Sequence, residues 1–188
     1  MTTTVGMPSP RTFLVSAAAA TFLLAAGASS ASAAGCSGAR AVASARTISP
    51  ARQAIICLVN AERVRRARAP VVANGDLTVA AQRHSVDMVA RRFFAHETPN
   101  GTSVRERVQR TGYLRGAWRW SLGENIGWAA QTGATPAVMV RAWMNSPGHR
   151  AIILNTRFRE AGVGIATGVP TQGLSGATFT MDFGLAAH

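Results

Sequence analysis

Four histidines are the residues of this 188-residue chain best suited to acid–base or metal chemistry. The spacing His-Glu-x-x-His, which would put two zinc ligands on one helix face, does not occur in the sequence. His84 shares an apolar stripe with Leu77, Ala81 and Met88, at helical spacings of four, three and four. This pattern predicts a histidine that lies in the core or directly behind a site. His188 ends the chain, and we expect it to be exposed to solvent.

His149 stands three residues after Ser146, where a helix is predicted to begin. Ser146 is the predicted N-cap, and Pro147 suits the first helical position. In the first turn the positive end of the helix dipole disfavours protonation, and a neutral imidazole can bind a metal or accept a proton. An alternative of equal weight is that His149 is a structural residue, which ties the loop to a sheet by hydrogen bonds. A serine hydrolase built on Ser146, His149 and Glu124 is not favoured, because the cap already explains Ser146 and no nucleophile-elbow motif precedes it.

Tryptophans are further candidates for ligand contacts. Trp118 and Trp120 stand beside Arg115 and Arg119 in a stretch that is predicted to be a polar loop. We expect these two side chains to contact a ligand. Trp143 falls within a predicted helix and is expected to lie in the core.

The first residues have the layout of a secretion signal. Arg11 precedes an apolar run over residues 13–24, which is shorter than a membrane-spanning helix, and small residues then lead to an Ala-Ser-Ala site ending at Ala33. We therefore predict a signal peptide over residues 1–33 and a secreted, extracellular protein that begins at Ala34.

Two cysteines fit this compartment, because oxidising surroundings allow a pair to form a disulfide. We predict a bond between Cys36 and Cys57. The alternative is a protein anchored by a lipid on Cys36, but the large aliphatic residue expected three positions before such a cysteine is absent.

The chain is strongly basic, with a formal net charge of +12, and all of its basic residues are arginines. These charges are spread through several predicted helices, and no nucleic-acid-binding motif accompanies them, so we expect no nucleic-acid partner. Outside a cell, such a charge favours anionic cell-wall polymers or a membrane surface, and a solvated surface that keeps the protein soluble is the alternative.

Hydrophobic periodicity predicts helices first and strands later. Residues 34–49 read as a linker, and a domain over residues 50–188 follows it. The Ser49-Pro50 signal predicts the start of the first helix, and Asp76 is a predicted cap of the second. Apolar and polar residues alternate over 177–183, which predicts a half-buried strand, and a shorter one is expected near 161–167. This order points to an α+β domain with a mostly antiparallel sheet.

Several motifs in this order resemble the bacterial branch of the CAP superfamily (cysteine-rich secretory proteins, antigen five and pathogenesis-related proteins; the SCP domain). The resemblance covers about residues 51–184 and rests on Phe-Phe-Ala-His-Glu-Thr-Pro-Asn-Gly from residue 93, Gly-Tyr from 112, Gly-Glu-Asn from 123, Ala-Trp-Met-Asn-Ser-Pro-Gly-His-Arg from 142, Gly-Val-Gly from 162 and Asp-Phe-Gly from 182. It implies a three-layer α-β-α sandwich with a central antiparallel sheet.

The resemblance also implies a shallow cleft lined by His96, Glu124 and His149. A second acidic residue that the family can place there corresponds to Ser146 in this chain. Two imidazoles and one carboxylate suit zinc and leave a coordination position open for water, as a hydrolytic site requires. Because the fourth protein ligand is missing, we expect zinc or another divalent cation to bind only weakly, and no cofactor to be required.

Two function classes follow from the resemblance. The favoured one is a non-catalytic extracellular module that binds a small lipid, glycan or peptide in the cleft. The alternative is a metal-assisted, protease-like hydrolase that uses His96, Glu124 and His149.

Overall fold

A computed structural model describes residues 35–188; the predicted signal peptide over 1–33 lies outside the described residues. Within 35–188 no helix combines the length and the apolar character needed to span a membrane. The elements in chain order are α2 (Ile48–Val64), β1 (Val72–Ala73), α3 (Gly75–Arg91), α4 (Val104–Gln109), β2 (Arg119–Ala130), the 3-10 turn η1 (Gln131–Gly133), α5 (Pro136–Asn145), α6 (Pro147–Ile153), β3 (Glu160–Thr167) and β4 (Gly176–Ala187).

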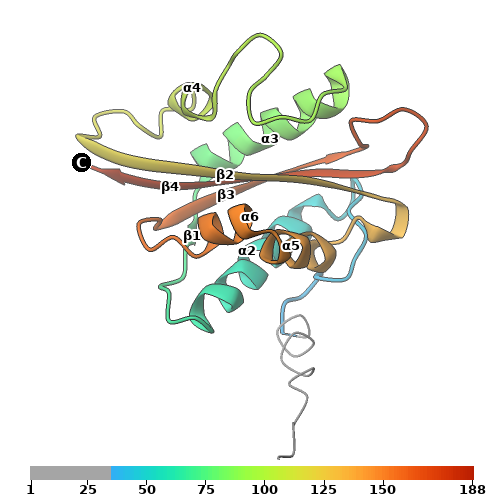
Figure 1. The fold of residues 1–188 in the computed structure, drawn as a ribbon, viewed down its shortest axis with the longest axis horizontal. Helices are drawn as coiled ribbons and strands as arrows, with labels where there is room; N and C mark the ends of the chain where they lie inside the picture. The colour runs from blue at the N-terminus through green and yellow to red at the C-terminus, as the bar shows by residue number, and fades with distance from the viewer. Residues whose placement is uncertain (1–34) are drawn as a thin grey trace, which may run out of the picture.

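A four-stranded sheet in the order β1-β3-β4-β2 forms the middle layer. β4 is antiparallel to both neighbours, and only the short β1 runs parallel to β3. Helices α3 and α4 lie on one face of the sheet, and α2, α5 and α6 lie on the other (Figure 1). The predicted α-β-α sandwich with a mostly antiparallel sheet is therefore confirmed.

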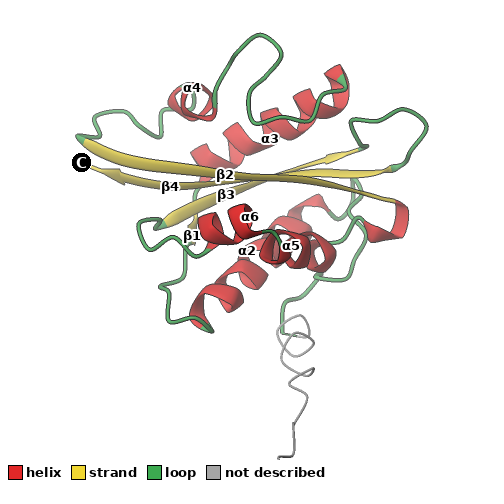
Figure 2. Cartoon of the chain, in the orientation of Figure 1, coloured by secondary structure: helices red, strands yellow, loops and turns green. Residues whose placement is uncertain are grey.

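The central strand β4 is buried on both faces, so the prediction of a half-buried strand was wrong. Phe179, Met181 and Phe183 pack into the main core with residues of α2 and α5. Their alternating neighbours face α3, where the Ser85 hydroxyl donates to Thr180 Oγ1 at 2.8 Å. The two helical layers explain the difference, because they leave neither face of this strand open to water (Figure 2).

Helix α3 lies unusually close to β3. A Cβ atom at Gly162 or Gly164 would overlap the backbone of α3, so the Gly-Val-Gly motif is what permits this contact. The helix is capped by Asn74, whose side chain accepts from the Leu77 amide at 3.1 Å, and not by Asp76 as we predicted. Asn74 follows β1 directly, and its extended backbone is suited to an N-cap.

The segment before α2 packs against the domain. Cys36, Ala39 and Ala43 are buried in the main core, and the Ala43 amide donates to the carbonyl oxygen of Ala134. The predicted Cys36–Cys57 disulfide is present, with 5.8 Å between the two Cα atoms. Residues 36–43, within the predicted linker, thus form part of the packed structure. The helix itself begins at Ile48, one residue before the predicted cap.

We expect replacement of both cysteines by alanine to lower the free energy of unfolding by about 2–4 kcal/mol, because the bond closes a loop between residues 21 apart in sequence. Guanidinium chloride denaturation of the wild type and the double variant measures this difference. The reduced wild type is the matched control and should unfold like the variant. Equal stability of the oxidised wild type and the variant would contradict a stabilising role for the bond.

Candidate functional site

The carboxylate of Glu124 is the centre of the candidate site. It lies in β2, is only 4% exposed, and faces the layer of α3 and α4. His96 Nδ1 is 2.8 Å from Glu124 Oε1, and Arg107 Nη2 donates to Oε2 at 2.5 Å. Burial alone would raise the pKa of Glu124, but the hydrogen bond from His96 and the charge of Arg107 outweigh it and lower the pKa. Glu124 is therefore a buried, charged carboxylate that accepts one hydrogen bond on each of its oxygens.

Arg107 holds both the carboxylate and the loop that carries His96. Its Nη1 group donates to the carbonyl oxygens of His96 at 2.8 Å and Thr102 at 3.2 Å. The arginine is presented by α4, which Ser103 and Glu106 start with a reciprocal capping box. This short helix thus brings a guanidinium into the protein interior next to the sheet.

His96 is the accessible member of the site, with a side chain that is 54% exposed. Because Nδ1 contacts Glu124, Nε2 is the ring nitrogen left for a ligand. The hydrogen bond to Glu124 raises the pKa of His96, and partial burial opposes this rise. A carboxylate that orients an imidazole in this way favours one ring orientation and one tautomer.

His149 approaches β2 from the opposite face. It lies in the first turn of α6, and its carbonyl oxygen accepts from Asn125 Nδ2 at 3.2 Å. Consecutive strand residues point to opposite faces, so Glu124 and Asn125 bring His96 and His149 to the two sides of the same strand. Burial first, and then the charge of His96, lower the pKa of His149. Ser146 occupies the N-cap position, but its side chain makes no capping bond, which corrects our prediction.

Comparison of the sequence with protein families places the chain in a known family. The model of the cysteine-rich secretory protein family (CAP) matches residues 57–183. The chain belongs to the CAP family.

Several bacterial proteins are similar to this CAP domain in sequence or in fold. It is 32% identical over 137 residues to the uncharacterized protein YkwD of Bacillus subtilis, covering 73% of this chain and 48% of that protein. It is 27% identical, with a TM-score of 0.60, to the structure of an extracellular protein containing an SCP domain from Bacillus anthracis, covering 75% of this chain and 43% of the other. An outer surface protein of Borrelia burgdorferi shares the fold at 17% identity and a TM-score of 0.56, over 71% of this chain and 90% of the other. The chain spans less than half the length of the two Bacillus proteins.

The donor atoms of this CAP domain do not fit a zinc ion. Among residues 35–188, no group of three His, Cys, Asp or Glu side chains is arranged to hold a metal. Both oxygens of Glu124 are already engaged, and the cation of Arg107 stands beside them. The charge of Arg107 opposes the binding of a divalent cation at this carboxylate. The structure thus brings His96 directly onto Glu124 and places His149 across the strand, but it does not form the metal triple.

The tryptophan candidates form a separate surface. Trp118 is 71% exposed and carries the guanidinium of Arg119 over its ring at 5.1 Å, while Arg105 lies over Trp120 at 5.3 Å. Trp120 belongs to β2 and not to a loop as we predicted. Trp120 precedes Glu124 by four positions, which is about 13 Å along the strand. Trp143 is buried in the core, as predicted.

Two charged residues beside Glu124 were not identified in the sequence analysis. Arg107 is one of several arginines around α4, yet it shares the buried face of that helix with Val108. Asp182 pairs with Glu124 across the β2–β4 register and is fully buried, with no hydrogen-bond partner for either carboxyl oxygen among the described residues. Burial and the charge of Glu124 raise the pKa of Asp182 well above its ordinary value.

The buried histidine behind the site was predicted correctly. His84 is inaccessible to solvent, its Nε2 lies 3.0 Å from the Ala95 carbonyl oxygen, and it is 3.9 Å from Glu124 Oε2. Burial lowers the pKa of His84, so its ring is neutral.

We expect proton NMR titration of the histidine rings to give a pKa above about 6.5 for His96 and below it for His149. The stabilising His96–Glu124 interaction is then fully present below the unfolded pKa and is lost as the pH rises through the folded pKa of His96. His149 acts in the opposite direction, because its protonation below about pH 6.5 favours the unfolded chain.

The matched variant for this titration is Glu124→Gln. It removes the charged acceptor and should lower the pKa of His96 while His149 shifts little. An unchanged His96 pKa in the folded variant would contradict the hydrogen bond.

Proposed function

We propose that this CAP domain is an extracellular, non-catalytic binding module that presents His96 and His149 to a ligand on the edge of its sheet. The observation that carries this proposal is the engagement of both Glu124 oxygens by His96 and Arg107. A carboxylate held in this way positions His96, and the adjacent cation of Arg107 disfavours a metal ion at its oxygens. The predicted signal peptide, the disulfide and the extracellular relative from Bacillus anthracis support the location outside the cell.

An extended peptide is the ligand that this geometry supports best. β2 is an end strand of the sheet, paired among the described strands only with β4. The outer edge of an end strand carries backbone donors and acceptors that can pair with an added strand. Trp143 Nε1 donates to the Ile126 carbonyl oxygen and covers part of this edge. The stretch near Glu124, flanked by His96 and His149, is where a peptide would add.

A small lipid or glycan is supported less well at these residues. The side chains around Glu124 are charged or polar, which suits a lipid chain poorly. The exposed rings of Trp118 and Trp120 could stack on a sugar, but they lie about 13 Å along the strand from Glu124. These two ligand classes therefore serve as alternatives in the binding test.

A hydrolase remains the second candidate, because one observation favours it. A carboxylate-oriented imidazole with a free Nε2 is the arrangement of a general base, and Glu124 holds His96 in this way. Against it, the metal donors do not fit, and no hydrogen bond joins Ser146 to either histidine among the described residues.

To test binding, heptapeptides can be selected from a phage-displayed random library on the mature protein and titrated by calorimetry. We expect His96→Ala and His149→Ala each to weaken binding by roughly tenfold, as expected when a hydrogen bond to a charged or polar group is lost. Arg141→Gln, an exposed change on α5, is the matched control and should leave affinity unchanged. Equal affinity in all variants, or saturable histidine-dependent binding of chitotetraose or lauric acid instead, would contradict the peptide proposal.

To test the hydrolase candidate, release of fluorescence from labelled casein can be followed with and without added zinc. We expect no hydrolysis above that of the His96→Ala variant, and zinc binding weaker than a three-ligand site gives, because the ion competes with Arg107 for Glu124. Ser146→Glu adds a carboxylate without removing a capping bond and should tighten zinc binding if residue 146 faces the site. Zinc-dependent hydrolysis by the wild type that His96→Ala abolishes would overturn the non-catalytic proposal.

A further inference from the structure

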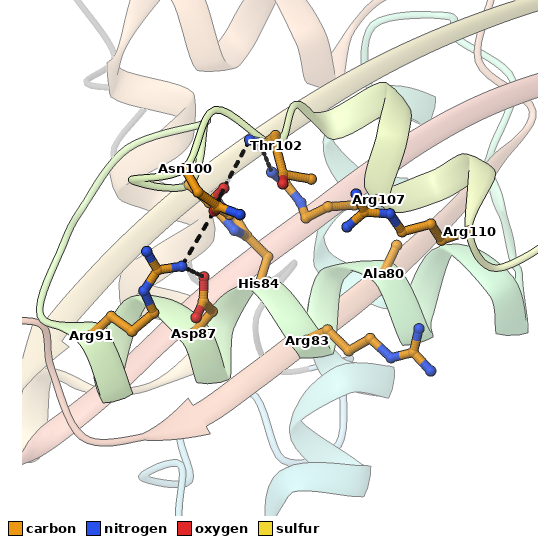
Figure 3. A pocket seen from close by; sticks show the side chains of 10 residues that line it. Ala80, Arg83, His84, Asp87, Arg91, Asn100, Thr102, Arg107 and Arg110 are labelled. Carbon is orange, nitrogen blue, oxygen red and sulfur yellow. Dashed lines mark hydrogen bonds and ion pairs between the residues drawn. The ribbon is translucent and has the colours of Figure 1, made fainter.

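A hollow lies between the elements of the layer formed by α3 and α4. It is a pocket of about 340 Å³ between α3 and the segment from Thr98 to Arg110 (Figure 3). Its walls carry four arginines, Arg83, Arg91, Arg107 and Arg110, and one acidic residue. Arg83 and Arg91 come from α3, and the other two come from α4 and its C-terminal end, so guanidinium groups line opposite walls.

Two of these arginines have no acidic partner among residues 35–188. Arg91 lies 3.3 Å from Asp87, the acidic residue of the pocket, and Arg107 is neutralised by Glu124. Arg83 and Arg110 form no ion pair within the described part of the chain, and both are exposed. Their charges are therefore available to an anion, and guanidinium groups suit the oxygens of phosphate.

Two residues that line the pocket have buried polar atoms without hydrogen-bond partners among the described residues. His84 Nδ1 and Arg107 Nε are buried and make no hydrogen bond to the described residues, and the Arg107 side chain is only 7% exposed. His84 is neutral and its Nε2 donates to the Ala95 carbonyl oxygen, so Nδ1 is an acceptor. Arg107 Nε–H is a donor. His84 and Arg107 both line the pocket, and a hydroxyl group suits such an acceptor and donor because it both donates and accepts.

We propose that this pocket binds a small polyol that carries a phosphate group. The phosphate lies between Arg83 and Arg110, and a hydroxyl of the polyol reaches His84 and Arg107 Nε. The volume is at the lower end of that of small-molecule sites, which fits a ligand larger than a bare phosphate ion and smaller than a nucleotide. Arg107 also donates to Glu124, so the pocket and the His96 site share one side chain.

Glycerol 3-phosphate is the probe for this proposal, titrated by calorimetry into the mature protein at low, fixed ionic strength. We expect Arg83→Gln and Arg110→Gln each to weaken binding by roughly tenfold, the effect of losing a charged hydrogen bond. Arg110→Lys should retain part of the affinity because it keeps the charge. Arg141→Gln removes the same charge from the other helical layer and should leave the affinity for glycerol 3-phosphate unchanged. Because all three arginines are exposed, the variants should melt like the wild type.

Four outcomes would overturn the proposal. No saturable binding of glycerol 3-phosphate would remove the site, and equal weakening by Arg141→Gln would reduce it to the general attraction of a basic protein. Loss of binding in His149→Ala alone would place the anion at the other site. Inorganic phosphate or glycerol binding as tightly as glycerol 3-phosphate would contradict a ligand with both groups. None of these results depends on whether a peptide binds at β2.

Discussion

A carboxylate buried inside a sheet sandwich needs a positive partner, and Glu124 imposes this requirement on the elements around it. An ionised carboxylate in a poorly solvated interior is unstable unless it is paired and hydrogen-bonded. Arg107 supplies the charge, and α4 and the preceding loop are arranged to deliver it. The same guanidinium holds the His96 carbonyl oxygen, so the position of His96 follows from the neutralisation of Glu124. Burial and the charge of Glu124 raise the pKa of Asp182, adjacent on β4, because a second charge here would have no partner.

This constraint also limits what the site can do. Glu124 accepts hydrogen bonds from His96 and Arg107 on its two oxygens, and it therefore orients an imidazole beside a fixed positive charge. His84 completes the buried wall behind it, and Arg107 forms the boundary between the site at β2 and the arginine-lined pocket. A ligand in that pocket would contact the side chain that fixes His96. The two surfaces are thus physically connected through one residue.

The fold class and the stripe of α3 could be predicted from the sequence because each rests on a local pattern or on a family motif. The disulfide could be predicted because the chain has two cysteines and a predicted signal peptide. Motifs also identified His96, Glu124 and His149, but they could not reveal how the carboxylate is engaged, since Arg107 looks like any arginine of a basic helix. The alternation along β4 was detected and misassigned, because Thr178, Thr180 and Asp182 have the polarity of a solvent-facing row yet lie under α3. Whether this face of β4 is exposed depends on the helix that covers it, and the packing of that helix cannot be read from the strand's own sequence.

A double-mutant cycle between Arg107 and Glu124 tests the central claim most directly. The free energies of unfolding of Arg107→Gln, Glu124→Gln and the double variant are compared with that of the wild type by chemical denaturation. If each charge exists to neutralise the other, either single change should destabilise the protein by about 3–5 kcal/mol, because it leaves a buried charge unpaired. The double variant should then lose less than the sum by at least about 1 kcal/mol. Additive losses would contradict the account, because they would mean that the two groups act independently.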